Sequence, residues 1–260
     1  MTNQNKVLAH VSKYAVTYLF IALSTLFIVV SGLDINYVAS QLLLRLNRNA
    51  FIVLALIIPI IAGMGINFAI TIGAMAAQIG LLLTINWGVS GVPGILLAAA
   101  ITLPLGAFFG FLIGKLLNKM KGQETIGSLI LGYFANGAYQ LLFLFIFGSI
   151  IPLNSNVTIV GASGVQNTLN LTGSVGLYTA PRQLGFIAAS AILIGGATVS
   201  KAKVSHVLIG VFLFEGVLVF GQQIANSVVA GGGLSEVMRI MISNGIILYA
   251  LTQSGGANRD

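Results

Sequence analysis

The sequence predicts an all-α membrane protein, a polytopic bundle of about eight helical spans with both termini in the cytoplasm. Of its 260 residues, 57% are hydrophobic and only 7% are charged. Soluble domains carry about 25% charged residues, so this chain has too little polar surface to face water on every side. Apolar runs of roughly 20 residues recur along it, and a helix of that length spans a hydrocarbon core.

The predicted spans follow these apolar runs. They cover residues 14–33, 51–64, 68–85, 95–117, 126–151, 184–199, 207–228 and 237–251. The second and sixth are short, so we expect them to be tilted, broken or only partly spanning. Residues 1–260 are predicted to form a single transmembrane domain, in which the polar segment 152–181 is an external loop.

Basic residues in the loops orient the spans. With the N-terminus inside, the cytoplasmic segments hold Lys6, Lys13, Lys115, Lys119, Lys121, Lys201, Lys203 and Arg259, and the outer segments hold Arg45, Arg48, Arg182 and Arg239. This bias favours both termini inside. Arg45 and Arg48 oppose it, and we place them on a short external helix, 37–49, before the second span.

The sequence contains no pattern of an enzyme or a nucleic-acid-binding protein. It has no cysteine, no HExxH and no GxSxG, and its two histidines, His10 and His206, fall near predicted membrane edges. Gly114-Lys115 is followed by Leu116, where a P-loop needs Ser or Thr. We therefore predict no catalytic residue, no metal and no cofactor. The net charge of +7 lacks the basic stripe with interleaved aromatics of a nucleic-acid interface.

Glycine-rich patterns in two segments predict either close helix packing or a break in a helix. Gly63, Gly65 and Gly73, with Asn67 among them, interrupt the start of the third span. Such a stretch favours either non-helical backbone beside a substrate path or tight helix packing, and both interpretations stay open. Glycines four residues apart at 106, 110 and 114 predict close helix contact.

Polar residues inside the predicted spans are candidates for a solute path. Glu215 lies in the middle of the seventh span, where a carboxylate is costly unless it is paired, protonated or hydrated. It serves either transport or a buried structural bond. No basic residue lies deep in another predicted span, which predicts a protonated Glu215. The neutral candidates suit an uncharged polar solute, although such residues often only join helices; they are Asn67, Gln78, Asn136, Gln140, Gln222 and Gln223.

The loop 115–125 is the most charged short stretch of the chain. One interpretation is a cytoplasmic loop whose positive charge only orients the neighbouring spans. The other is that the loop is, in addition, a contact surface for a cytoplasmic partner. In the second case the contact residues are Lys119, Lys121, Gln123 and Glu124.

Three stretches carry a family resemblance. They are 65–73 (GINFAITIG), 122–136 (GQETIGSLILGYFAN), and 189–201 (ASAILIGGATVSK) followed by 209–214 (IGVFLF). They resemble the integral-membrane permeases of ABC importers for simple sugars, nucleosides and branched-chain amino acids, the ribose-permease type. Asn67 stands where that family usually has an Asp.

The resemblance implies a setting and a set of partners. Such permeases lie in the bacterial inner or plasma membrane, work in pairs of identical or related chains, and contact two cytoplasmic ABC ATPases. An extracellular or periplasmic substrate-binding protein delivers the solute. In an importer of this kind we expect the path residues to be Asn67, Gln78, Asn136, Gln140 and Glu215. If the family's cytoplasmic coupling helix is absent from this chain, the loop 115–125 is the leading remaining candidate for the ATPase contact.

The chain departs from that family in one respect. Its members have about ten spans and a cytoplasmic coupling helix, and no such segment is present between residues 152 and 189. Two spans and their loop are expected to be missing near 174–178, so this is either a shortened relative or a sequence that omits a stretch.

Other functions stay open beside the importer. An ion- or proton-coupled carrier or channel would use Glu215 as its titrating group. A non-transporting membrane scaffold would fit the shortened architecture. A membrane enzyme is disfavoured by the absence of a catalytic pattern.

Overall fold

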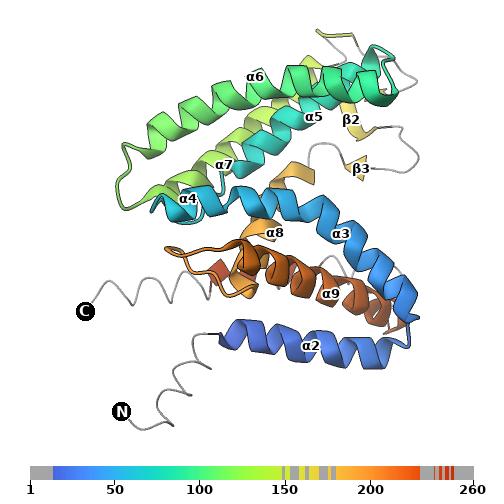
Figure 1. The fold of residues 1–260 in the computed structure, drawn as a ribbon. Helices are drawn as coiled ribbons and strands as arrows, with labels where there is room; N and C mark the ends of the chain where they lie inside the picture. The colour runs from blue at the N-terminus through green and yellow to red at the C-terminus, as the bar shows by residue number, and fades with distance from the viewer. Residues whose placement is uncertain are drawn as a thin grey trace. The chain divides into compact units, whose positions relative to one another are not determined.

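The computed structural model describes residues 14–147, 150–152, 158–161, 164–169, 175–176 and 180–228, together with residues 237, 240, 241, 244, 245, 247 and 248. The chain folds into two compact units (Figure 1). Unit 1 contains residues 1–66 and 186–260, and unit 2 contains residues 67–185. Unit 1 is therefore built from both ends of the chain, and unit 2 is inserted between them.

Three helical stretches in the described part of the chain are long and apolar enough to cross a membrane. They are Ile35–Ile61, Gly91–Leu117 and Val204–Gly221. Large apolar side chains such as Val29, Phe51, Phe111 and Phe134 are exposed on the surface. Lipid covers such a surface at less cost than water does. The protein is thus helical and suited to a membrane, while the eight spans and their orientation stay predictions.

The continuous described segments of unit 1 contain four helices and the second part of a fifth. These are α2 (Ala15–Ser31), α3 (Ile35–Ala55), α4 (Ile57–Ile61) and α9 (Val204–Val228), and the end of α8 (Ala180–Ile194). Helix α9 packs against both α2 and α3 (Figure 1). Val38, Leu42, Val219 and Phe220 are buried together where α3 meets α9.

Helix α3 begins at a tight turn after α2. Gly32 ends α2 at φ 61°, and the Asp34 carboxylate accepts bonds from the backbone N–H groups of Asn36 and Tyr37 at 3.2 and 3.3 Å. No glycine or proline interrupts the chain from there to Pro59, so α3 runs unbroken to Ala55. The prediction of a short helix at 37–49, separate from the second span, is therefore wrong.

Helices α8 and α9 cross with their backbones almost in contact. A Cβ placed on Gly195 would lie 2.7 Å from the carbonyl carbon of His206, and one on Gly210 would lie 2.8 Å from that of Ala191. Real side chains do not occupy such spaces, so glycine is required at both positions. The turn after α8 contains Gly196 at φ 94°.

Unit 2 is a helical layer built around α5. It contains α5 (Ile70–Asn86), α6 (Gly91–Leu117), α7 (Glu124–Leu141) and the π-helical turn η1 (Leu142–Ile146). Helix α5 packs against α6 and α7 (Figure 1). An aromatic ladder continues the core from α7 through η1, because the Tyr139 and Phe143 ring centroids lie 4.4 Å apart and those of Phe143 and Phe147 lie 5.0 Å apart.

The close contact between α5 and α6 uses a different glycine from those predicted. A Cβ on Gly80 would lie 2.9 Å from the Ala98 carbonyl oxygen. At Gly106, Gly110 and Gly114 a Cβ would meet nothing within 4 Å among the described atoms. Within the described chain, the predicted packing stripe on α6 is therefore not a place where another backbone comes close enough to require glycine.

The backbone between α4 and α5 is not helical. From residue 62 to residue 69 it forms two turns with irregular backbone between them, and Gly63 and Gly65 have φ values of 80° and 70°. This confirms the interpretation that the glycines near Asn67 break the helix. A substrate path beside the break stays a prediction.

The predicted external loop contains a small antiparallel sheet, which the sequence did not indicate. Its strands are β1 (Thr158–Gly161), β2 (Gly164–Leu169) and β3 (Val175–Gly176), in the order β1-β2-β3. Val160 pairs with Val165, and Leu169 pairs with Val175. The missing segment predicted near 174–178 stays a prediction, and three of those five residues lie outside the described part.

The predicted eighth span lies mostly outside the described residues. Seven of its positions are described, and all seven are helical.

Candidate functional site

Four residues on one face of α7 form what we call the α7 stripe. They are Ser128, Gly132, Asn136 and Gln140, each one helical turn from the next. The first member of the stripe, Ser128, contacts the backbone just before α5. The Ser128 hydroxyl accepts a bond from the Phe68 N–H at 3.0 Å and donates one to the Thr125 carbonyl at 2.8 Å. A Cβ on Gly132 would lie 3.5 Å from the Phe68 carbonyl oxygen, so α7 and α5 approach closely here.

Asn136 is the unusual member of the α7 stripe. Its side chain is only 7% exposed, and its Oδ1 has no hydrogen-bond partner among the described residues. Buried polar atoms are nearly always bonded, and an open acceptor in a buried place calls for a donor. Gln140, one turn further along, is half-buried. The stripe therefore offers an unused neutral acceptor in unit 2.

Gln78 of α5 joins the same region through Tyr139. The Tyr139 hydroxyl donates to the Gln78 Oε1, and Tyr139 is 4% exposed. Tyr139 lies between Asn136 and Gln140 in the chain, so Gln78 meets α7 at the turns that carry both amides. Of the predicted path residues, Gln78 thus contacts α7 through Tyr139, and Asn136 and Gln140 lie on α7 within one turn of Tyr139 in the chain.

Asn67 has a local bond at the start of α5. Its Oδ1 accepts from the Ala69 N–H at 3.0 Å, which is the usual way an Asn side chain closes a turn. The Thr71 hydroxyl bonds back to the Phe68 carbonyl at 3.1 Å. The structure thus gives Asn67 a role in shaping the entry to α5. The side chains of Gln222 and Gln223 lie outside the described part.

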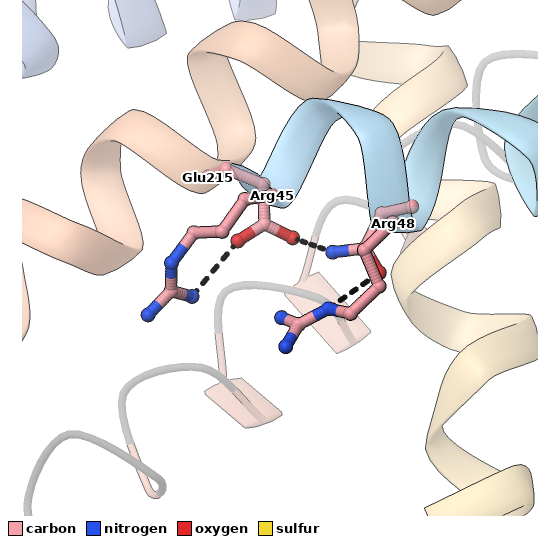
Figure 2. A network of polar contacts seen from close by, with 4 residues as sticks. Arg45, Arg48 and Glu215 are labelled. Atoms are coloured by element: carbon pink, nitrogen blue, oxygen red, sulfur yellow. Dashed lines mark hydrogen bonds and ion pairs between the residues drawn. The ribbon is translucent and has the colours of Figure 1, made fainter. Parts of the chain in front are cut away.

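Glu215 belongs to a separate group in unit 1, which we call the Glu215 cluster: Arg45, Arg48, Asn49 and Glu215 (Figure 2). Arg45 Nη1 lies 3.0 Å from Glu215 Oε2, and the Asn49 amide donates to the other carboxylate oxygen. Arg48 Nε donates to Asn49 Oδ1 at 3.4 Å. Glu215 is 3% exposed. Among the described residues, the polar contacts of this buried carboxylate therefore come from α3.

The prediction that Glu215 has no basic partner is wrong. The physical reason is the length of α3, which carries Arg45 alongside α9 instead of leaving it on an external helix. A guanidinium partner offsets part of the cost of placing a carboxylate in an apolar bundle. The spacing of Arg45, Arg48 and Asn49, at i, i+3 and i+4, was a usable signal, because such residues share one helix face.

The predicted ATPase contact lies on a tight corner between α6 and α7. Lys119, Lys121 and Gln123 are exposed. Glu124 is half-buried, and its carboxylate accepts the Gly122 N–H at 3.0 Å, so it stabilises the turn in which Gly122 has φ 82°. Three of the four predicted contact residues thus remain open to a partner.

No family model matches this chain, and it matches no curated protein and no solved structure. The permease family stays a resemblance carried by the three stretches of sequence quoted for it.

Proposed function

We propose that the chain is a transmembrane subunit of an ATP-driven importer and forms part of the path of a small, uncharged polar solute. Simple sugars and nucleosides are the leading solutes. The observation that carries the proposal is the buried Asn136, whose open acceptor lies on α7 next to the Tyr139–Gln78 pair. A site of neutral amides and a hydroxyl suits a solute that offers hydroxyl and N–H groups.

The resemblance supplies the remaining parts of the proposal. The chain has no P-loop, so ATP hydrolysis belongs to cytoplasmic ABC ATPases. A second permease completes the path, and a substrate-binding protein delivers the solute from outside. The setting is a bacterial inner or plasma membrane, crossed several times with both termini inside. Lys119, Lys121 and Gln123 are the residues proposed to contact the ATPase.

Within this proposal the predicted path residues divide into two roles. Gln78, Asn136 and Gln140 contact the solute, and Asn67 shapes the backbone turn that leads into α5. Glu215 serves as the partner of Arg45 and Asn49 that joins α9 to α3.

The test is uptake by the complex that co-purifies with the chain, reconstituted into liposomes with ATP inside. A panel of labelled simple sugars and nucleosides identifies the solute. Asn136→Leu removes the open acceptor at similar volume, and Asn47→Leu is the matched control because Asn47 is exposed on α3 of unit 1. We expect Asn136→Leu to reduce uptake at least tenfold with assembly unchanged, since a buried hydrogen bond to the solute is lost.

Three other outcomes have distinct meanings. Equal uptake by both variants would remove Asn136 from the path. Uptake that survives ATP depletion and collapses with an uncoupler would favour an ion-coupled carrier. A complex that binds no ATPase and moves no solute would favour a membrane scaffold.

A further inference from the structure

The Glu215 cluster contains more positive than negative charge. Arg45 and Arg48 each carry a guanidinium. Among the described residues, Glu215 is the one carboxylate that pairs with either arginine. Glu215 is already bonded by Arg45 and by Asn49. Arg48 reaches only the neutral Asn49 oxygen, at a long 3.4 Å. One positive charge, that of Arg48, therefore has no counter-charge in the described part of the chain.

The surplus charge lies in an apolar helix. Arg48 is near the middle of the candidate span Ile35–Ile61, and its side chain is exposed while Asn49 and Glu215 are buried. An unpaired arginine in the hydrocarbon region is costly and is normally met by water or by an anion. The location thus favours a ligand that brings one negative charge to Arg48.

The geometry also fits an anion with several oxygen atoms. Figure 2 shows the guanidinium groups of Arg45 and Arg48 extending from the same side of α3, and the two residues are one helical turn apart. Arg45 uses Nη1 for Glu215, and Arg48 uses Nε for Asn49. Each guanidinium has five N–H donors, so both keep donors for the forked contacts that arginine makes with phosphate.

We infer that Arg45 and Arg48 form a binding site for a phosphate group, with Arg48 as its main contact. Glu215 and Asn49 hold the two arginines in place. The phosphate comes either from the headgroup of a membrane phospholipid or from free phosphate. This site lies in unit 1 and does not depend on the proposed transport function, which rests on α5 and α7 of unit 2.

The test measures thermal unfolding of the purified full chain in detergent with two probes. The first is inorganic phosphate, titrated against chloride at matched ionic strength. The second is phosphatidylglycerol, titrated against diacylglycerol with the same acyl chains and no phosphate. We expect a saturable rise of the melting temperature with at least one probe. A rise with phosphate identifies a free oxyanion site, and a rise with phosphatidylglycerol alone identifies a lipid headgroup site.

Variants assign the effect to the arginine. Arg48→Gln should weaken the apparent affinity roughly 10- to 100-fold, the size of a lost hydrogen bond to a charged group. Lys121→Gln is the control, because it removes one exposed positive charge from unit 2 and should leave the affinity unchanged. Arg48→Lys keeps the positive charge but removes the forked donors of the guanidinium, so it should weaken binding by a smaller factor. This variant replaces Arg48→Gln in the test if Arg48→Gln does not fold.

The inference is overturned if neither probe gives a saturable rise with the native chain. It is also overturned if Arg48→Gln binds as tightly as the native chain, or if Lys121→Gln loses as much affinity as Arg48→Gln. In the absence of folded Arg48→Gln, equal affinity of Arg48→Lys and the native chain contradicts a guanidinium site.

Discussion

Gly210 of α9 lies directly against Ala191 of α8, so close that a Cβ on Gly210 would be 2.8 Å from the Ala191 carbonyl carbon. One turn away, Gly195 meets His206 in the same manner. Across the crossing, Gly195 faces the backbone of His206 and Gly210 faces the backbone of Ala191. Small residues at this spacing allow helix backbones to approach.

Gly210→Ala should lower the melting temperature by several degrees, because overpacking a close contact costs about 1–3 kcal/mol. The matched control is Gly106→Ala on α6, where a Cβ meets nothing within 4 Å among the described atoms. Thermal unfolding in the same detergent compares the two. A native-like melting temperature for Gly210→Ala would show that the helices separate easily at this crossing.

Arg45→Gln and Glu215→Gln should each destabilise unit 1, because removing one partner of a buried ion pair leaves the other charge uncompensated. Such losses are about 3–5 kcal/mol for fully buried pairs, and a smaller loss is expected here because the Arg45 side chain is 27% exposed. The double variant should lose less than the sum of the single variants. Denaturant titration of the native chain, the two single variants and the double variant gives the four free energies of unfolding of a double-mutant cycle. If the losses of the two single variants add up to that of the double variant, Arg45 and Glu215 do not interact.

Ser128→Ala should destabilise unit 2 by about 1–3 kcal/mol, since the buried Phe68 N–H loses its acceptor. Thr25→Ala is the control: its hydroxyl is exposed and bonds only to Ile21 in the same helix. The readout is the unfolding midpoint in denaturant. Equal midpoints for the two variants would mean that the Phe68 N–H finds another acceptor.

Lys119→Glu combined with Lys121→Glu should reduce recovery of an ABC ATPase with the chain by roughly tenfold or more. The substituted carboxylates would repel the acidic surface of the ATPase that the two lysines are proposed to attract. Lys201→Glu is the control, as Lys201 is exposed at the α8–α9 turn and predicted to lie on the same membrane side. The amount of ATPase that co-purifies is the measurement. Equal recovery from both proteins would remove the α6–α7 corner from the contact.

The helices themselves were predictable because apolar runs are local signals. The span predicted at 95–117 is the helix Gly91–Leu117, and the one predicted at 207–228 is Val204–Val228. The break near Asn67 was also predictable, since glycines that reach positive φ interrupt a helix. Gln78, Asn136 and Gln140 were selected from sequence, but Tyr139, whose hydroxyl bonds to Gln78, was missed because that hydroxyl is no more conspicuous than that of any other tyrosine.

The partner of Glu215 could not be predicted from local pattern. Arg45 lies 170 residues before Glu215 in the chain, and the loop-charge rule assigned it to the outside. The glycine contacts failed for a related reason: the four-residue spacing at 106, 110 and 114 is a local pattern and does not say whether another helix lies against that face. Only the packed structure distinguishes Gly80 and Gly210, which touch a neighbouring backbone, from Gly106, which does not.

Because unit 1 is divided between the two ends of the chain, its two parts are synthesised at different times. Ribosomes add about 5–20 residues per second, so roughly 10–30 s separate the synthesis of Arg45 from that of Glu215, its partner 170 residues later. Throughout that interval α3 carries two cations with no carboxylate from α9. The α3–α9 packing and the Arg45–Glu215 pair of unit 1 can therefore form only after the last third of the protein has been made.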